Sequence, residues 1–128
     1  MALNIIFGGK QYAALENTTV YPSGNANVRS RMEIHMAEDA MALEAFVALV
    51  SDEANTMNIR LVGWRDVEGS PVVDYDTAYT YFVIVSEVGK KRVDTVDNAT
   101  GAVTSEYHLV AVLEQLTYIE QQLHKLGL

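Results

Sequence analysis

The amino-acid sequence predicts an α+β fold, mainly an antiparallel β-sheet with one central amphipathic helix and a short C-terminal helix. Three observations support this prediction. Residues 28–36 alternate between apolar and polar side chains, which is the two-residue period of a strand. Residues 43–50 change to the 3.6-residue period of a helix. Turn sequences separate the other β-rich segments, and the order strands, helix, strands, helix favours hairpins over β-α-β units.

Length and composition indicate a single domain, residues 1–128. A chain of 128 residues with 49% hydrophobic residues can bury a core without help from metals or disulfides. Because the sequence contains no cysteine, it excludes disulfides, zinc-thiolate sites and thiol catalysis.

The N-terminal segment predicts a β-hairpin. Alternating side chains begin at Leu3 and stop at Gly8-Gly9. Glycines tolerate the positive φ of tight turns, so a second strand is expected from Gln11. A proline beside glycine and asparagine then predicts another turn, at Tyr21-Pro22-Ser23-Gly24-Asn25.

The next segment predicts the clearest strand, with a dry face and a charged face. The dry face holds Val28, Ser30, Met32, Ile34 and Met36. The charged face holds Arg29, Arg31, Glu33 and His35. We therefore expect the His35 side chain at the surface.

The central helix is predicted from the helical spacing of Leu43, Phe46, Val47 and Val50. We expect it to begin near Asp39, because a carboxylate suits the positive N-terminus of a helix. The polar run 51–55 ends it. A helix of about three turns is marginal alone in water, so it must pack against the sheet.

The second half of the chain predicts long β segments. Strands are expected at 57–64 and, after a loop at 65–71, at 77–88. Residues 79–85 are apolar or aromatic on both faces, which indicates a central strand covered on both sides. The run from Asp97 to Gly101 predicts a hairpin turn. Gly89-Lys90 leaves two alternatives open, another turn or a kink in one long arm.

The C-terminal region has a heptad-like spacing that is typical of a helical interface. The spacing is 3-4-3-4-3, over Leu109, Val112, Leu116, Ile119, Leu123 and Leu126. Residues 107–113 are also β-rich, so we expect a strand to about Leu113 and a helix from about Leu116 to Lys125. Two alternatives follow. The helix docks on its own sheet, which is the favoured reading, or it associates with another copy.

The charge pattern argues against nucleic-acid and membrane partners. The net charge is −8, and basic residues cluster only at Lys90-Lys91-Arg92. A nucleic-acid surface needs a concentrated basic patch, and anionic membranes are disfavoured for the same reason. The start Met-Ala-Leu-Asn lacks the basic region of a signal peptide, so we expect a cytoplasmic location.

No arrangement of residues predicts catalysis, a cofactor or a metal. His35, His108 and His124 are far apart in sequence, and we expect His35 and His124 to be ordinary surface residues. Carboxylates gather at Asp66, Glu68, Asp74 and Asp76, without a calcium-loop pattern. Gly8-Gly9-Lys10 lacks the other residues of a phosphate loop. We therefore expect no enzyme, no catalytic residues, no cofactor and no metal.

Aromatic residues gather in one part of the sequence. Trp64 lies near Tyr75, Tyr79, Tyr81 and Phe82. Aromatics at two-residue spacing usually form cross-strand pairs and core, which is the favoured reading. Tyr79 and Tyr81 are kept as candidate interface residues, together with the six residues of the heptad-like spacing.

The hairpin around Asp97–Gly101 and the segment 113–123 resemble small tail or baseplate proteins of phages and prophages of Gram-positive bacteria. The likeness is one of layout and is strongest over residues 57–128. It implies a non-enzymatic subunit that assembles into a ring or onto a tail tip, as a homo-oligomer or with other tail subunits, and that becomes part of the virion. No catalytic residue is implied. The alternative function is a monomeric module that binds a carbohydrate or peptide through aromatics around Trp64 and Tyr79.

Overall fold

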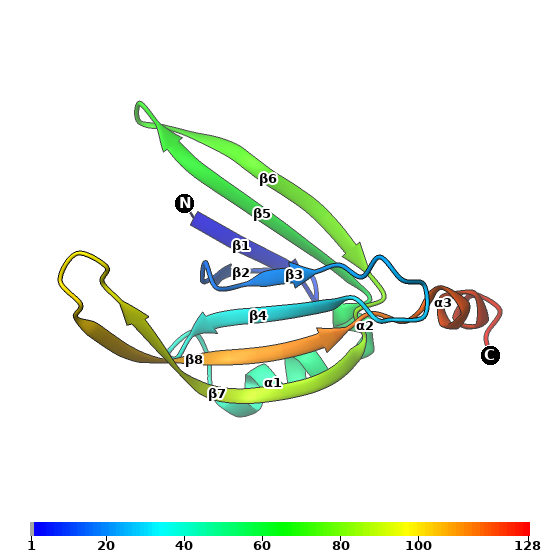
Figure 1. The fold of residues 1–128 in the computed structure, drawn as a ribbon. Helices are drawn as coiled ribbons and strands as arrows, with labels where there is room; N and C mark the ends of the chain where they lie inside the picture. The colour runs from blue at the N-terminus through cyan, green and yellow to red at the C-terminus, as the bar shows by residue number, and fades with distance from the viewer. Residues whose placement is uncertain (1) are drawn as a thin grey trace.

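The computed structural model describes residues 2–128, and it contains two antiparallel four-stranded sheets (Figure 1). The first sheet has the order β2-β1-β5-β6 and the second β3-β4-β8-β7. The strands of the first sheet are β1 (Ala2–Phe7), β2 (Lys10–Ala14), β5 (Asn58–Val67) and β6 (Ser70–Thr80). Those of the second are β3 (Thr19–Tyr21), β4 (Arg31–Ala37), β7 (Ile84–Val96) and β8 (Val103–Glu114).

Three helices complete the described part of the chain: α1 (Leu43–Ser51), α2 (Glu53–Thr56) and α3 (Tyr118–Lys125). The predicted α+β class, with a mainly antiparallel sheet, is confirmed. The predicted end of the last strand and the C-terminal helix are also found within a few residues of the expected bounds. Residues 28–30 lie outside β4, so the strand begins later than predicted.

The core lies between the two sheets and is closed by α1. Met32, Ile34 and Met36 project into it from β4, as their alternation predicts, and Phe46 and Val50 project from α1. All five side chains are fully buried. Burying side chains of this size stabilises the fold by roughly 1.5–3 kcal/mol each. The helix begins at Leu43, later than predicted. Asp39 precedes it, and Ala42 at the cap position makes no side-chain hydrogen bond.

Residues 77–88 do not form one central strand, and this prediction is wrong. β6 ends at Thr80 and β7 begins at Ile84, and each is the edge strand of a different sheet. The sequence is apolar on both faces because the chain crosses from one sheet to the other here. Tyr79 faces the core from the first sheet, Phe82 fills the corner with 2% exposure, and Val85 packs on the core from the second sheet.

Two hairpins extend beyond the packed sheets. The β5–β6 hairpin turns at Glu68 and Gly69, whose φ values are 52° and 82°. This two-residue turn lies where a loop at 65–71 was expected, so that prediction is wrong. The β7–β8 hairpin turns at 97–102, as predicted, with Gly101 at φ 72°. β7 continues unbroken through Gly89-Lys90, so these residues belong to one long arm.

Both arms project from the same end of the molecule, and α3 lies at the opposite end (Figure 1). We call residues 65–72 the β5–β6 arm, because the last described pair between β1 and β5 is Ala2 with Trp64. We call residues 92–107 the β7–β8 arm, because the last pair between β4 and β8 is Ala37 with His108. Each arm is a two-stranded ribbon.

The charged face predicted for β4 is only partly exposed. The His35 side chain is buried, and so is the His108 side chain of β8, although we expected His35 at the surface. His35 lies opposite Val110 in the register, and His108 lies diagonally beside it on the same face. The prediction of a solvent-exposed face is wrong here because the two histidines bond each other and can therefore be buried. The side-chain pattern of a single strand cannot reveal such a pair.

Gly8 and Gly9 offer a matched test of the first turn. Both have positive φ, 60° and 75°. A Cβ on Gly8 would lie 2.8 Å from Oδ1 of Asn55, whereas a Cβ on Gly9 would meet nothing within 4 Å. The Asn55 side chain cannot swing away freely, because its Nδ2 donates to the Leu49 carbonyl at 3.0 Å.

We therefore expect Gly9→Ala to lower the free energy of unfolding by roughly 1–2 kcal/mol, the conformational term alone. Gly8→Ala should lower it by about 1 kcal/mol more, because the Asn55 hydrogen bond is also lost. Denaturant unfolding of both variants measures the difference. Equal losses would show that Asn55 does not hold the turn against α2.

Candidate interaction surface

The C-terminal helix α3 begins at a well-formed cap. The Thr117 side chain accepts a hydrogen bond from the Glu120 backbone N–H, and the Glu120 carboxylate accepts one from the Thr117 backbone N–H at 2.9 Å. This reciprocal pair satisfies two N–H groups that a helix start otherwise leaves free. The sequence Thr-x-x-Glu therefore fixes where β8 gives way to α3.

Polar side chains anchor α3 to the body of the molecule. Glu120 forms a bidentate ion pair with Arg29, in which Arg29 Nη2 lies 3.0 Å from Glu120 Oε2. His124 Nε2 lies 2.9 Å from Oε1 of Glu53 in α2. The His124 ring also packs edge-to-face on Tyr81, with 5.7 Å between ring centroids. The polar side of this helix thus faces the protein.

The apolar side of α3 faces solvent. Ile119 is 65% exposed, Leu123 44% and Leu126 73%. Tyr118 and Leu128 are exposed beside them. We call these five residues the apolar strip. A helix on a globular protein normally turns its apolar side toward the core, so this orientation is inverted. A contiguous exposed apolar patch marks an interaction site.

The structure divides the predicted interface residues into two groups. Leu109 and Val112 are buried in β8, on opposite faces of the second sheet, so they share no surface with α3. Their inclusion in one continuous seam is wrong, because the strand period separates them. Leu116 is half-buried at the junction, and Ile119, Leu123 and Leu126 remain together on α3.

The two predicted interface tyrosines, Tyr79 and Tyr81, are half-buried and contact other residues of the chain. The Tyr79 ring packs edge-to-face on Phe82, with 6.0 Å between centroids, and its hydroxyl contacts that of Tyr75. Tyr81, at φ 66°, lies in the segment that joins β6 to β7, and its ring contacts His124 of α3. Its N–H donates to the Met57 carbonyl, and its carbonyl accepts from Leu116 N–H. Both tyrosines are half-buried.

The arms also expose apolar side chains, on the face that continues from the core. In the β7–β8 arm these are Val96, Val103 and Tyr107, and Val96 pairs directly with Val103. In the β5–β6 arm they are Val67 and Val72. Strand alternation places each of them on the same side as the buried residues of its strand. The molecule thus has exposed apolar groups at both ends.

Three acidic residues of the hairpins, Asp74, Asp76 and Asp94, are held in ion pairs and hydrogen bonds within the chain. Arg60 bonds Asp76, and this hydrogen bond lowers the pKa of the Asp76 carboxyl. The Ser105 hydroxyl and the Arg92 guanidinium lower the pKa of Asp94 in the same way. Arg65 Nε donates to Asp74 at 2.8 Å. Among residues 2–128, no group of three or more metal-binding side chains is placed to hold an ion.

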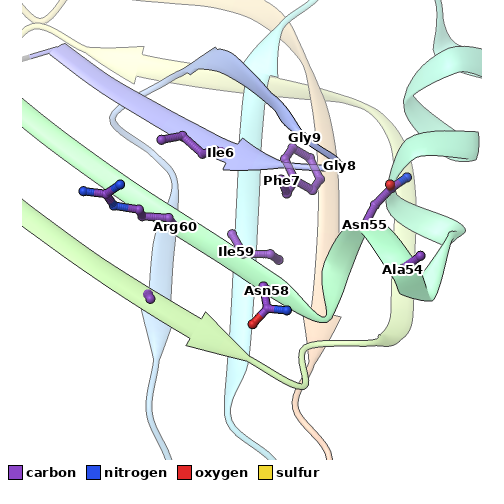
Figure 2. Close-up of a pocket in the computed structure, with 10 residues that line it drawn as sticks. Ile6, Phe7, Gly8, Gly9, Ala54, Asn55, Asn58, Ile59 and Arg60 are labelled. Carbon is purple, nitrogen blue, oxygen red and sulfur yellow. The ribbon is translucent and has the colours of Figure 1, made fainter.

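Two hollows on the surface are candidate ligand sites, and neither has the groups that its ligand would need. One, of about 470 Å³, lies between the Gly8-Gly9 turn, α2 and β5 (Figure 2). Its cation, Arg60, is already bound to Asp76. The other, of about 750 Å³, lies at Trp64, Arg65 and Pro71. Trp64 is on the face of the first sheet opposite to Tyr79, so these two aromatics do not form the single platform that the alternative function requires.

A chain of four side chains, in which the two histidines are buried, was missed by the sequence reasoning. His35 Nδ1 lies 2.9 Å from His108 Nδ1. His35 Nε2 lies 2.7 Å from Glu33 Oε1, and His108 Nε2 lies 2.8 Å from Glu106 Oε1. Each glutamate precedes its histidine by two residues, so Glu-x-His occurs once in each of the two paired strands. That repeated spacing was the only indication in the sequence.

The Arg29–Glu120 contact predicts how α3 responds to acid. The Thr117 backbone N–H, together with the Arg29 guanidinium, holds the pKa of Glu120 below its usual value. A lowered pKa in the folded state contributes stability above the ordinary range of a glutamate, about pH 4.3, and loses it as the pH falls through the folded value. Protonated Glu120 would release both Thr117 and Arg29.

We therefore expect amide hydrogen exchange in 118–126 to rise in acid before that of β1 and β5 does. Glu120→Gln should give faster exchange in this segment already at neutral pH. Glu16→Gln, which changes a carboxylate elsewhere, is the control and should leave the segment unchanged. Exchange in 118–126 that is the same in Glu120→Gln and the native protein would contradict this account of the anchor.

Comparison with known proteins gives no relative for this chain: no protein-family model, no curated protein and no solved structure matches it. No helix within residues 2–128 has the length and apolar character needed to cross a membrane.

Proposed function

We propose that this chain is a non-enzymatic structural subunit of an assembly, of the phage tail or baseplate type, that acts through protein–protein contacts between copies. The observation that carries the proposal is the inverted orientation of α3. Its polar groups are used on the protein side, and its apolar strip is left in water. Exposure of this strip to water is unfavourable, and a partner that covers the strip would remove it from water.

The arms support the same conclusion. A two-stranded ribbon with both faces in water is marginal by itself, because too little apolar surface is buried to offset the loss of chain entropy. Contact of a neighbouring copy with Val96, Val103 and Tyr107 would supply the missing burial. The long edge strands β6 and β7 also retain unpaired backbone groups, which a neighbour can engage.

The positions of these surfaces favour head-to-tail contacts. The arms and α3 lie at opposite ends of the molecule (Figure 1), so a contact between α3 of one copy and the arms of the next uses two different surfaces. Such a contact forms a ring when the rotation closes and a filament when it does not. A ring, or assembly onto a tail tip, is the architecture that the layout resemblance over residues 57–128 implies.

The first experiment measures the mass in solution by size-exclusion chromatography with light scattering, over a wide range of concentration. We expect the native chain to form a species larger than its own 14.1 kDa. Ile119→Asp with Leu126→Asp should reduce the mass to that of one chain, because two charges would enter the apolar strip. Val28→Asp, at an exposed apolar residue outside α3 and the arms, should leave the mass unchanged.

A mixing experiment tests the head-to-tail arrangement. Val96→Asp with Val103→Asp blocks the arm end and leaves α3 intact. Each blocked variant should be monomeric alone, whereas a mixture of the two should form a species of two chains, joined through the one intact end of each. Circular dichroism confirms that both variants are folded. A native chain that stays monomeric at every concentration overturns the proposal, and a mixture that stays monomeric overturns the head-to-tail contact.

A further inference from the structure

We propose that Glu33, His35, His108 and Glu106 form a pH-sensitive latch, which holds the root of the β7–β8 arm and is closed by one proton shared between the two histidines. The latch is a regulatory device in addition to the proposed assembly role. It rests on the three hydrogen bonds of the chain and on its place in the second sheet, and it does not depend on α3 or on a partner.

The hydrogen bonds define how many protons the two rings carry. An ionised carboxylate only accepts hydrogen bonds, so Nε2 of each histidine must donate to its glutamate. The contact between the two Nδ1 atoms, at 2.9 Å, needs one donor and one acceptor. The two rings therefore carry three protons in total, and together they bear one positive charge.

Other proton counts do not satisfy this geometry. With two protons, both placed on Nε2, two lone pairs would face each other across the Nδ1 contact. With four protons, two N–H groups would face each other, and two positive charges would be buried side by side. The rings are 7% and 2% exposed, so water cannot relieve either arrangement.

A metal ion does not explain the contact. Zinc held by two imidazole nitrogens keeps them about 3.3 Å apart, given zinc–nitrogen bonds of 2.0–2.1 Å and tetrahedral angles. The two Nδ1 atoms are closer than that, and residues 2–128 supply no third ligand at this place. The distance is that of a hydrogen bond.

The charges around the latch favour one positive charge. Lys91 of β7 pairs in register with His108, but it is bound to Glu87 on its own strand. Farther along the same face, Arg31 of β4 lies opposite Glu114 of β8. On the side of β3, the Thr18 hydroxyl bonds only the backbone of His35. Carboxylates therefore outnumber the cations on this face, and Glu33 and Glu106 contact the rings directly.

The latch lies where the second sheet narrows. Ala37 with His108 is the last pair between β4 and β8, and beyond it β8 is paired only with β7. His35 is on β4, and His108 is the last residue of β8 that pairs with β4 before the arm begins. The Nδ1 contact thus joins the anchored strand to the root of the arm, and its loss would lengthen the unsupported ribbon.

This arrangement gives the arm a window of stability on the pH scale. In acid, an unfolded chain protonates both imidazoles and so binds one proton more than the latch, which means that stability falls as the pH drops below about 6.5. In alkali, the latch binds one proton more than the unfolded chain, so stability falls as the pH rises until that proton leaves. The root of the arm is therefore most stable near about pH 6.5, and its stability falls on either side.

Nitrogen-15 NMR of the histidine rings of the native protein tests the proton count directly. We expect three of the four ring nitrogens of His35 and His108 to carry protons near neutral pH, with a Nδ1 proton shifted far downfield. His124, which is exposed and contacts Glu53 rather than either of these rings, is the internal reference. Two protons or four protons on the pair would overturn the proposal, and so would a zinc titration that displaces the shared proton.

Hydrogen exchange tests the effect on the arm. After correction for intrinsic rates, exchange in 103–108 should rise about tenfold or more from pH 7 to pH 5, the size of one pH unit of linkage. Exchange in the β5–β6 arm, residues 65–72, should stay constant. A change that is equal in both arms would overturn the latch.

A conservative variant defines the upper limit of the window. Glu106→Gln keeps an acceptor for His108 Nε2 and removes the charge, and Glu106 is mostly exposed, so the fold is retained. The pair then holds its shared proton less tightly, so the alkaline rise in exchange of 103–108 should level off about one pH unit earlier and reach a smaller final value. Glu53→Gln, beside His124, is the matched control and should leave this rise unchanged. An unchanged alkaline limit in Glu106→Gln would overturn the shared proton.

Discussion

The structure depends on β8 being dry on both faces. β8 lies between β4 and β7 in the second sheet, and its residues 108–113 are all buried. Leu109, Ala111 and Leu113 fill the core on one face, while His108, Val110 and Val112 lie on the other. A strand that is dry on both faces leaves no exposed position for a polar group. Any polar side chain in it must be satisfied from within the protein, because an unpaired buried group is destabilising by about 1–3 kcal/mol. The histidine chain meets this requirement for His108.

The same strand determines where the candidate interaction surfaces lie. At one end it continues as the β7–β8 arm, beyond the last pair with β4. At its other end, Gln115 N–H donates to the Ser30 carbonyl and Leu116 N–H donates to the Tyr81 carbonyl, and α3 follows directly. Because β8 runs as one strand from Val103 to Glu114, its two ends hold the arm and α3 far apart (Figure 1). A change at the latch would therefore affect the arm more than the apolar strip, which has its own anchors in Arg29 and Glu53.

Most patterns confined to one element were read correctly from the sequence, apart from the start of α1 and the loop expected at 65–71, and patterns shared between elements were not. The dry face of β4, the turn at 97–101 and the change from strand to helix near residue 115 each follow from local side-chain period and turn chemistry. The run 79–85 was wrongly predicted to be one central strand because its two apolar faces belong to two different sheets. The chain passes from one sheet to the other at Phe82. His35 misled because its partner is 73 residues away, and no local pattern marks a diagonal pair. The heptad-like spacing held only where the backbone is helical, which is why Ile119, Leu123 and Leu126 share a surface and Leu109 and Val112 do not.

The way α3 is held explains how an apolar strip can persist on a folded chain. Its anchors are ion pairs and hydrogen bonds between partly exposed groups, and such pairs typically contribute about 0.2–1 kcal/mol each. They are enough to position an eight-residue helix that begins at a capping box, but they bury little apolar surface. Covering Ile119, Leu123 and Leu126 with a neighbour would contribute more, on the order of 1.5–3 kcal/mol for each side chain fully buried. In the proposed assembly, weak polar contacts would therefore direct the helix before it meets a partner, and apolar burial would be its main stabilisation afterwards. This order would allow the chain to fold alone and would leave its strongest unmade contact for the proposed assembly.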